Sequence, residues 1–183
     1  MNGWETIIEA LKAEGIEFLF GLPTTHLMAH MKNTPEVRVI QVRHEASGVF
    51  MATAYARLTG KPGVVYASPG PGVANMAPGI LEAYAACTPL VAPCPSVGLD
   101  VEGMGAFQET DQVSLFKPIT KWSARVPRAD RIPWFIHRAF SLAVNGKPGP
   151  IFLDIPSDVA YAEVEKPEYT PARRIRVCGD PAL

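Results

Sequence analysis

The chain has 183 residues, of which 48% are hydrophobic and 19% are charged; this is typical of a globular protein with one substantial core. Its formal net charge of −1 and pI of about 6.4 argue against a protein that binds nucleic acid or a membrane surface electrostatically. Its apolar runs are interrupted well before the length of a membrane span, and the pattern of a signal peptide is not visible at residues 1–5.

The three cysteines, Cys87, Cys94 and Cys178, show no Cys-x-x-Cys spacing. An odd number of unclustered cysteines predicts free thiols in a reducing cytoplasm rather than disulfides or a zinc site. His30 and His137 lack the spacing of metal ligands, so no metal-binding residue is predicted.

Apolar residues at helical spacing predict a first helix that ends near Gly15, followed by a short buried strand at residues 16–20. The turn Gly21-Leu22-Pro23 leads into a second helix that begins at Thr24 or Thr25. The other predicted strands are residues 37–42, 63–67, 89–93, 119–124 and 151–155, and the other predicted helices are residues 46–58, 73–86, 111–116 and 133–144. This alternation predicts an α/β fold: an open, mostly parallel six-stranded sheet with helices on both faces.

After Val159 the pattern changes. Residues 162–177 are polar, contain two prolines and show no period, which is typical of a linker. Asp180 and Pro181 are typical of the N-cap and first position of another helix. We therefore expect one domain at residues 1–160, and an exit linker with the truncated start of a following domain at residues 161–183; a natural C-terminus is the alternative.

Ligands of such sheets bind beyond the carboxyl ends of the strands. Four loops meet at that edge in the prediction: residues 21–25, residues 44–45, residues 68–75 and the loop that holds Phe107 and Gln108. Glu45 lies at the junction between a predicted strand and a predicted helix, and the unpaired N–H groups at the start of a helix favour a carboxylate. Taken alone, Glu45 is an ordinary first-turn acid.

Five segments together carry a resemblance to a known family. They are Arg43-His44-Glu45, A-T-A-Y-A-R-L-T-G-K-P-G-V-V from residue 52, P-G-P-G-V-A-N from residue 69, A-F-Q-E-T-D from residue 106 and G-K-P-G-P-I-F-L-D-I-P-S-D-V from residue 146. In this order and spacing they resemble the thiamine diphosphate-dependent acetolactate synthase superfamily, which also holds benzoylformate and oxalyl-CoA decarboxylases and benzaldehyde lyase. The resemblance covers residues 3–160 and corresponds to the pyrimidine-binding domain of that family.

The resemblance implies a catalytic role for Glu45. In the family a glutamate hydrogen-bonds nitrogen N1′ of the pyrimidine and promotes the 4′-imino tautomer, which takes the proton from the thiazolium carbon. Pro23, Gly70, Gly72 and Asn75 match positions beside the pyrimidine ring. A raised pKa would suit such a carboxylate, whereas the helix N-terminus acts in the opposite direction.

Two of the loops depart from the family pattern. The usual Ser-Gly-Pro-Gly is here Ser-Pro-Gly-Pro-Gly at residues 68–72, and a phosphate-binding loop is excluded because the Lys-Ser/Thr of a P-loop is missing. Thr24-Thr25-His26 replaces the usual Gly-Gly and is similar to benzaldehyde lyase, so His26 is either a proton relay to substrate or a solvent-facing helix residue. Phe107 and Gln108 match the segment that lines the substrate side of the cofactor.

The resemblance implies the pyrimidine-binding half of an enzyme that makes or breaks a carbon–carbon bond next to a carbonyl, in a small 2-oxoacid or aldehyde. The family holds the diphosphate through Mg²⁺ in a separate domain, and only Gly179-Asp180-Pro181 is similar to that motif here. We therefore expect a diphosphate-binding domain or subunit as partner, a homodimer or tetramer, and an inactive isolated chain. The alternatives are a natural small subunit, as in split sulfopyruvate decarboxylases, and a non-catalytic dimerisation module.

Overall fold

The computed structural model describes residues 1–22, 25–31, 34–165 and 168–175, and it shows a sheet whose strand pairs all run parallel. The described residues form six strands in the order β2-β1-β3-β4-β6-β5. Their bounds are β1 Phe18–Gly21, β2 Arg38–Gln41, β3 Gly63–Tyr66, β4 Leu90–Ser96, β5 Trp122–Arg125 and β6 Pro150–Pro156. The predicted open α/β sheet is confirmed, and it is wholly parallel in the part described.

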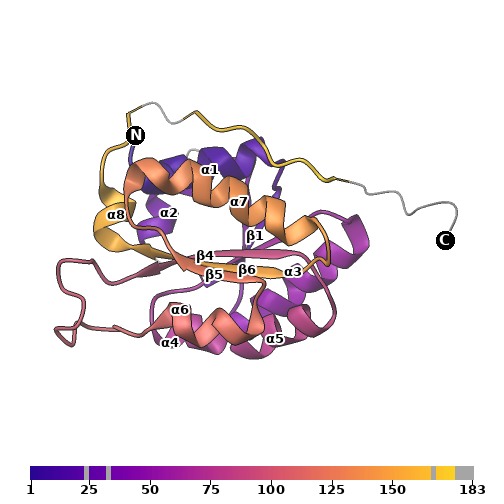
Figure 1. Cartoon of the computed structure of the whole chain (residues 1–183), viewed down its shortest axis with the longest axis horizontal. Coiled ribbons are helices and arrows are strands. Elements are labelled where there is room, and N and C mark those ends of the chain that lie inside the picture. Colours follow the sequence, from indigo (N-terminus) through magenta and orange to yellow (C-terminus); the bar gives the residue numbers. More distant parts are fainter. Residues whose placement is uncertain (23–24, 32–33, 166–167, 176–183) are drawn as a thin grey trace, which may run out of the picture.

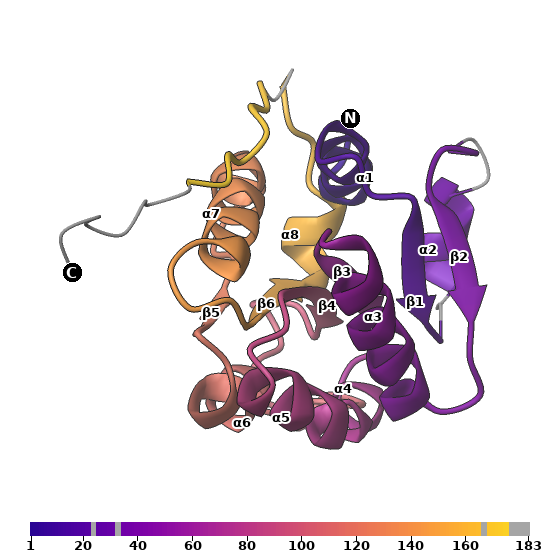
Figure 2. The same cartoon turned by 90° about the vertical axis from the view of Figure 1, so that its right-hand side faces the viewer.

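Helices cover both faces of the sheet (Figure 1). On one face lie α1 (Gly3–Ala13), α2 (Thr25–Met31), α7 (Ile132–Val144) and α8 (Ser157–Tyr161); on the other lie α3 (Glu45–Thr59), α4 (Pro71–Asn75), α5 (Ala77–Ala85) and α6 (Gln112–Phe116). The view along the sheet in Figure 2 separates these two layers. Short 3₁₀ turns at Lys117–Ile119 and Ala129–Arg131 lead toward β5 and α7.

The two layers enclose two separate apolar clusters. Successive strand residues point to opposite faces, so Val64 packs with the α1–α7 cluster and Val65 with the α3–α5 cluster. Leu153 and Phe152 divide in the same way on β6. The uninterrupted apolar runs of the central strands therefore reflect burial on both sides.

Two predicted elements differ from the structure: one predicted helix is divided in two, and one predicted strand begins later. The single helix expected at residues 73–86 is two helices, α4 and α5, which meet at Met76. Pro78, near the start of α5, has no N–H group to continue the hydrogen-bond ladder of α4. The strand expected at residues 119–124 begins only at Trp122, because residues 117–119 form a 3₁₀ turn.

β4 runs to Ser96, three residues beyond its predicted end, although Pro93 and Pro95 lie within it. The carbonyl of Pro89 accepts a hydrogen bond from Gly63 N, so the odd-numbered residues of this strand face β3. The pairs between β3 and β4 stop at Val91, and both prolines lie past that point. The missing N–H groups of the two prolines therefore remove no hydrogen bond between β3 and β4. The loop after β4 was predicted to start at residue 95, and in the structure it starts at residue 97.

Residues 168–175, which the sequence assigns to a linker, lie extended along α7 and beside α1 (Figure 1). Glu14 Oε1 accepts a hydrogen bond from Ala172 N at 2.7 Å and another from the Tyr169 hydroxyl. Asn145 Nδ2 donates to the carbonyl of Arg173 at 3.0 Å. This stretch is thus fastened to the helices, while a domain boundary near residue 160 stays a prediction.

None of the helices in the described part of the chain is both long enough and apolar enough to cross a membrane.

Gly21, at the end of β1, lies where three segments come closest. A Cβ at this position would be 1.9 Å from the carbonyl oxygen of Tyr66 on β3. Gly48, in the second turn of α3, approaches from the other side, and its own Cβ would lie 3.3 Å from Gly21 Cα. The absence of both Cβ atoms lets α3 pack directly onto the ends of β1 and β3.

Replacing Gly21 with alanine is expected to lower the free energy of unfolding by at least about 3 kcal/mol, because the new methyl group must displace backbone of a neighbouring strand. Chemical denaturation of the 183-residue chain measures this. Gly15→Ala is the control: φ there is +70° with open space around it, so only about 1 kcal/mol should be lost. Equal losses in both variants would contradict the steric explanation.

Candidate functional site

The carboxyl ends of β1, β2, β3 and β4 open onto one edge, and the chain changes direction there. From β1 it moves to β2 on one side and then returns to β3 on the other, so β1 and β3 flank a topological switch point. Open parallel sheets bind ligands in the crevice outside such a point. The loops after β2, β3 and β4 supply the predicted site residues other than Pro23 and His26, which follow β1.

Glu45 is the first residue of α3 and is buried, with 6% of its surface exposed. His44 is the N-cap, and its Nδ1 accepts a hydrogen bond from Ala46 N at 3.2 Å, so this histidine shapes the start of the helix. The Asn75 side chain, at the end of α4, donates from Nδ2 to Glu45 Oε2 at 3.0 Å. The structure therefore brings Glu45 and Asn75, 30 positions apart, into direct contact.

The loop at residues 68–72 approaches Glu45 because two of its residues lack a Cβ. Gly70 has φ of +62°, and a Cβ on it would lie 2.4 Å from the backbone oxygen of Gln108. A Cβ on Gly72 would lie 2.4 Å from Ser68 Oγ and 3.0 Å from Glu45 Oε1. A larger residue at Gly70 would push the loop away from Gln108, and one at Gly72 would push it away from the Glu45 carboxylate.

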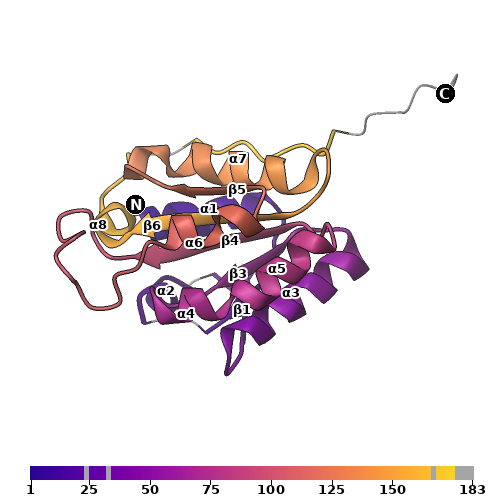
Figure 3. The same ribbon diagram turned by 60° about the horizontal axis from the view of Figure 1, so that its bottom comes forward.

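The long loop after β4 carries the other predicted residues and extends away from the body of the domain (Figure 3). Gln108 has φ of +66° and its backbone lies against Gly70. The ring of Phe107 is 89% exposed in this chain. The backbone of this segment therefore joins the Glu45 cluster, while Phe107 projects into solvent.

Glu109 stabilises the conformation of the tip of that loop. Its carboxylate accepts hydrogen bonds from the backbone N–H groups of Gly103 and Ala106, the second at 2.9 Å. These bonds hold the pKa of Glu109 below its ordinary value, because they stabilise the ionised form; the bond from Gly103 has the largest effect.

Pro23 and the side chain of His26 lie outside the described residues, so the first predicted loop is described only to Leu22. Among the residues that the structure does describe, no three His, Cys, Asp or Glu side chains are grouped as metal ligands. Cys94 is fully buried in β4, and burial raises the pKa of its thiol to about 12. Such a thiol is unreactive.

Sequence reasoning missed a buried polar chain that starts at Gln112. Gly70 N donates to Gln112 Oε1 at 2.7 Å, and Gln112 Nε2 donates to Asp154 Oδ1 at 2.6 Å. Arg125 Nε donates to the other oxygen of Asp154 at 2.5 Å and also pairs with Glu102. Gln112 and Asp154 are 1% and 0% exposed. The only sequence signal was an uncharged polar residue directly after the N-cap Asp111, where solvent exposure is the ordinary expectation.

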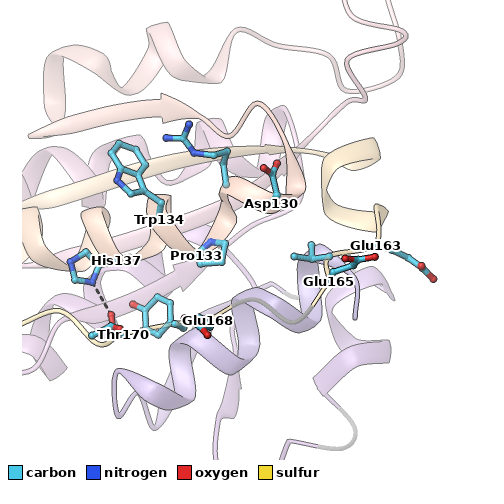
Figure 4. A pocket seen from close by; sticks show the side chains of 11 residues that line it. Asp130, Pro133, Trp134, His137, Glu163, Glu165, Glu168 and Thr170 are labelled. Atoms are coloured by element: carbon cyan, nitrogen blue, oxygen red, sulfur yellow. Dashed lines mark hydrogen bonds between the residues drawn. The ribbon is translucent and has the colours of Figure 1, made fainter.

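A large cavity in the described part of the chain lies away from this edge. It has a volume of about 840 Å³ and lies between α7 and the segment that follows α8 (Figure 4). Arg131, Trp134 and His137 line it from the α7 side, and Glu163, Glu165 and Glu168 from the other. None of the predicted site residues borders it, so its volume alone does not make it the functional site.

The geometry places a buried carboxylate, a side-chain amide and two close-approach glycines at the switch point of a parallel sheet. A family model of the thiamine pyrophosphate enzyme N-terminal TPP binding domain matches residues 1–115, and the chain belongs to this family. Thiamine pyrophosphate is thiamine diphosphate under another name.

Curated relatives with similar sequences include two acetolactate synthases and a lyase. The chain is 34% identical over 181 residues to a probable acetolactate synthase large subunit of Methanocaldococcus jannaschii, covering 98% of this chain and 31% of the relative. It is 37% identical over 180 residues to the acetolactate synthase large subunit of Haemophilus influenzae, covering 94% and 31%. It is 38% identical over 161 residues to 2-hydroxyacyl-CoA lyase 2 of Xenopus laevis, covering 87% and 25%. The chain thus spans a third or less of the length of these relatives.

The pKa of Glu109 predicts a pH-dependent loop. Because its pKa in the folded chain is below the ordinary 4.5, the bonds to Gly103 and Ala106 should persist above pH 4.5 and be lost as the pH falls through the lower value. The amide chemical shifts of Gly103 and Ala106, followed by NMR, should titrate together with a midpoint below 4.5. In Glu109→Gln this shared titration should vanish; a midpoint at or above 4.5 in the unmodified chain would contradict the bonds.

Proposed function

We propose that this chain is the pyrimidine-binding half of a thiamine diphosphate-dependent enzyme that makes or breaks a carbon–carbon bond next to a carbonyl, acting as a decarboxylase, carboligase or acetolactate synthase-like enzyme. The contact between buried Glu45 and Asn75 at the switch point carries the proposal. A carboxylate that only stabilised a helix start would not need an amide from another helix to fix one of its oxygens.

The residues present fit an aminopyrimidine ring. Asn75 holds Glu45 Oε2, which orients the carboxylate, and Oε1 lies on the side of Gly72, where a Cβ would come within 3.0 Å of it, so the glycine leaves this oxygen sterically unobstructed. Burial removes competing water, and a carboxylate in that environment shares a proton strongly with a ring nitrogen. Pro23, Gly70 and Gly72 are proposed to border the same ring.

When bound, thiamine diphosphate supplies a thiazolium carbon that becomes nucleophilic after losing its proton. In this proposal Glu45 holds a proton at Oε1 and exchanges it with the pyrimidine nitrogen, while Asn75 keeps the carboxylate from rotating. Such positioned proton transfer contributes roughly 10²–10⁴-fold to a rate.

Gln108 and Phe107 are proposed to contact the substrate, a small 2-oxoacid or aldehyde, together with His26. Gln108 is supported by its backbone position beside Gly70, within the Glu45 cluster. Phe107, almost fully exposed, would be covered only by another domain or chain.

The diphosphate end of the cofactor is proposed to bind elsewhere, through Mg²⁺ held by a diphosphate-binding domain or subunit. The described residues show no grouped ligands for that ion, and Gly179-Asp180-Pro181 lies outside them. The matched relatives extend far beyond the part aligned with this chain, which is consistent with a further domain. We propose that the isolated chain is inactive, and that the enzyme works in the cytoplasm.

A homo-oligomer, dimer or tetramer, is proposed from the outer surface of α3 and α5. Phe50, Met51 and Leu58 of α3 are 46%, 41% and 87% exposed, and Leu81 of α5 is 51% exposed. Large apolar side chains gathered on adjacent helices mark an interaction surface, because water contact with them is unfavourable.

The role of Glu45 is tested by Glu45→Gln in the assembled enzyme, this chain together with its diphosphate-binding part. The exchange of the thiazolium proton of bound thiamine diphosphate for deuterium, measured by quenched-flow NMR, requires no knowledge of the substrate. We expect exchange at least about 100-fold slower, because glutamine cannot pass a proton to the ring. Glu36→Gln, at an exposed position, should exchange normally. An unchanged rate in folded Glu45→Gln would remove the proposal and favour a non-catalytic module.

The proposed assembly is tested by sedimentation velocity. The 183-residue chain should sediment as a dimer or larger species at micromolar concentration, and Phe50→Ser with Leu58→Ser should shift it toward monomer by roughly tenfold or more in dissociation constant. Trp134→Ser is the matched control, because Trp134 is as exposed as Phe50, at 46%, and lies on α7, on the opposite face of the sheet from α3 and α5. A parent chain that sediments only as monomer would contradict the proposed surface.

A further inference from the structure

We propose that Gln112 is the positioning residue of this site: it fixes the loop at residues 68–72 and thereby sets, through α4, the contact of Asn75 with Glu45. Any effect of Gln112 on catalysis rests on the proposed function of Glu45. Its effect on the position of Asn75 does not, since it follows from hydrogen bonds within the described chain.

The side-chain amide of Gln112 makes three hydrogen bonds in a buried environment. Oε1 accepts from Gly70 N at 2.7 Å, and Nε2 donates to the carbonyl of Pro95 at 3.0 Å and to Asp154 Oδ1 at 2.6 Å. Both N–H groups and one oxygen lone pair are therefore used. One side chain thus joins the loop after β3 to the ends of β4 and β6.

Gly70 passes this restraint to α4. It is the N-cap of that helix, it has no side chain with which to cap it, and its carbonyl accepts from Ala74 N at 2.9 Å. Gln112 therefore fixes the one residue from which a five-residue helix starts. Asn75 is the last residue of α4, so a shift or rotation at Gly70 moves the amide that holds Glu45 Oε2.

The far end of this polar chain explains why an amide is needed here. Asp154 is fully buried, and its second oxygen is held by Arg125 Nε, so Oδ1 requires a donor from the other side. Gln112 offers a donor toward Asp154 and an acceptor toward Gly70. A glutamate would set two carboxylates against each other out of water, which is unfavourable until one of them is protonated. A methionine would leave Gly70 N, Pro95 O and Asp154 Oδ1 all without Gln112 as their partner.

These requirements define a set of variants for NMR on the 183-residue chain. In Gln112→Met we expect amide hydrogen exchange at Gly70 to be roughly tenfold faster or more, and the side-chain amide resonances of Asn75 to shift. Gln112→Glu should behave like Gln112→Met at neutral pH and return toward the parent spectrum as the pH falls, because a protonated carboxyl both donates and accepts. Gln41→Met, at an exposed position on β2, should leave Gly70 and Asn75 unchanged.

The exchanged pair Gln112→Glu with Asp154→Asn provides the rescue. The introduced asparagine can donate to the introduced glutamate, and that glutamate can still accept from Gly70 N. The Pro95 carbonyl still lacks the donor that Gln112 Nε2 supplies, so the Gly70 and Asn75 signals should recover in part at neutral pH, beyond what Gln112→Glu alone shows. If Gln112→Met does not fold, the comparison of this double variant with Gln112→Glu tests the proposal instead. Recovery supports the positioning role. Parent-like Gly70 exchange and Asn75 resonances in Gln112→Met, or a folded exchanged pair that stays as perturbed as Gln112→Glu, overturn it.

The assembled enzyme separates this inference from the proposed function. Cofactor proton exchange should slow about tenfold in Gln112→Met and recover in part in the exchanged pair. If Glu45→Gln leaves that exchange unchanged, the proposed function fails, whereas the NMR result still decides whether Gln112 positions Asn75. If Glu45→Gln is inactive and Gln112→Met keeps parent exchange rates, the positioning role is overturned and the function of Glu45 stands.

Discussion

Backbone segments approach one another at the carboxyl edge of the sheet more closely than side chains permit, and the site depends on this. At Gly21 the end of β1 meets β3, at Gly70 the loop after β3 meets Gln108, and at Gly72 the same loop meets Glu45. In each case a Cβ would come within 3.0 Å of an atom of the neighbouring segment. The cost of these glycines is entropic, roughly 0.5–1 kcal/mol each relative to alanine in regular structure. The apolar clusters on both faces offset that cost, because they hold the strands in place regardless of the loops.

Two kinds of interaction therefore position the site: apolar burial and directional hydrogen bonds. Apolar burial on both faces of the sheet sets where the strands end, and it is tolerant of small displacements because it has no preferred direction. Hydrogen bonds from buried side chains then fix the loops beyond those ends, because their strength falls steeply with distance and angle. Gln112, Asp154 and Asn75 belong to the second kind. In the proposed function the Glu45 carboxylate must meet one ring atom, and this would need such a directional restraint in addition to a core.

The sequence predicted the sheet well for a physical reason. Buried parallel strands must be apolar on both faces, so residues 63–67 and 151–155 are recognisable without any knowledge of their neighbours. Helix ends were harder, because α4 and α5 lie close together in one apolar stretch and the break at Met76 depends on where Pro78 falls in the ladder. β4 was predicted too short, since proline is tolerated there only because β3 no longer pairs beside it.

The candidate site was predicted unevenly for a related reason. Glu45, Gly70, Gly72 and Asn75 stand in short motifs, and the structure brings them together as a cluster. Their roles toward the cofactor stay a prediction. Gln112 carries no motif, and its importance comes from three partners that are distant in the sequence, Gly70, Pro95 and Asp154. Only the pairing of β4 with β6 and the path of the loop after β4 bring these together, and neither can be read from local spacing.

The two faces of the domain differ in a way that bears on where a partner would bind. On the α1–α7 face, residues 168–175 already cover part of the helices through Glu14, His137 and Asn145. On the α3–α5 face, large apolar side chains remain exposed, and Glu45 begins the first of these helices. The exposed ring of Phe107 lies on the loop whose backbone touches Gly70, next to the same cluster. Under the proposed function, a partner that buried both the α3–α5 surface and Phe107 would also close over the Glu45 edge, so assembly and completion of the proposed cofactor site would be coupled.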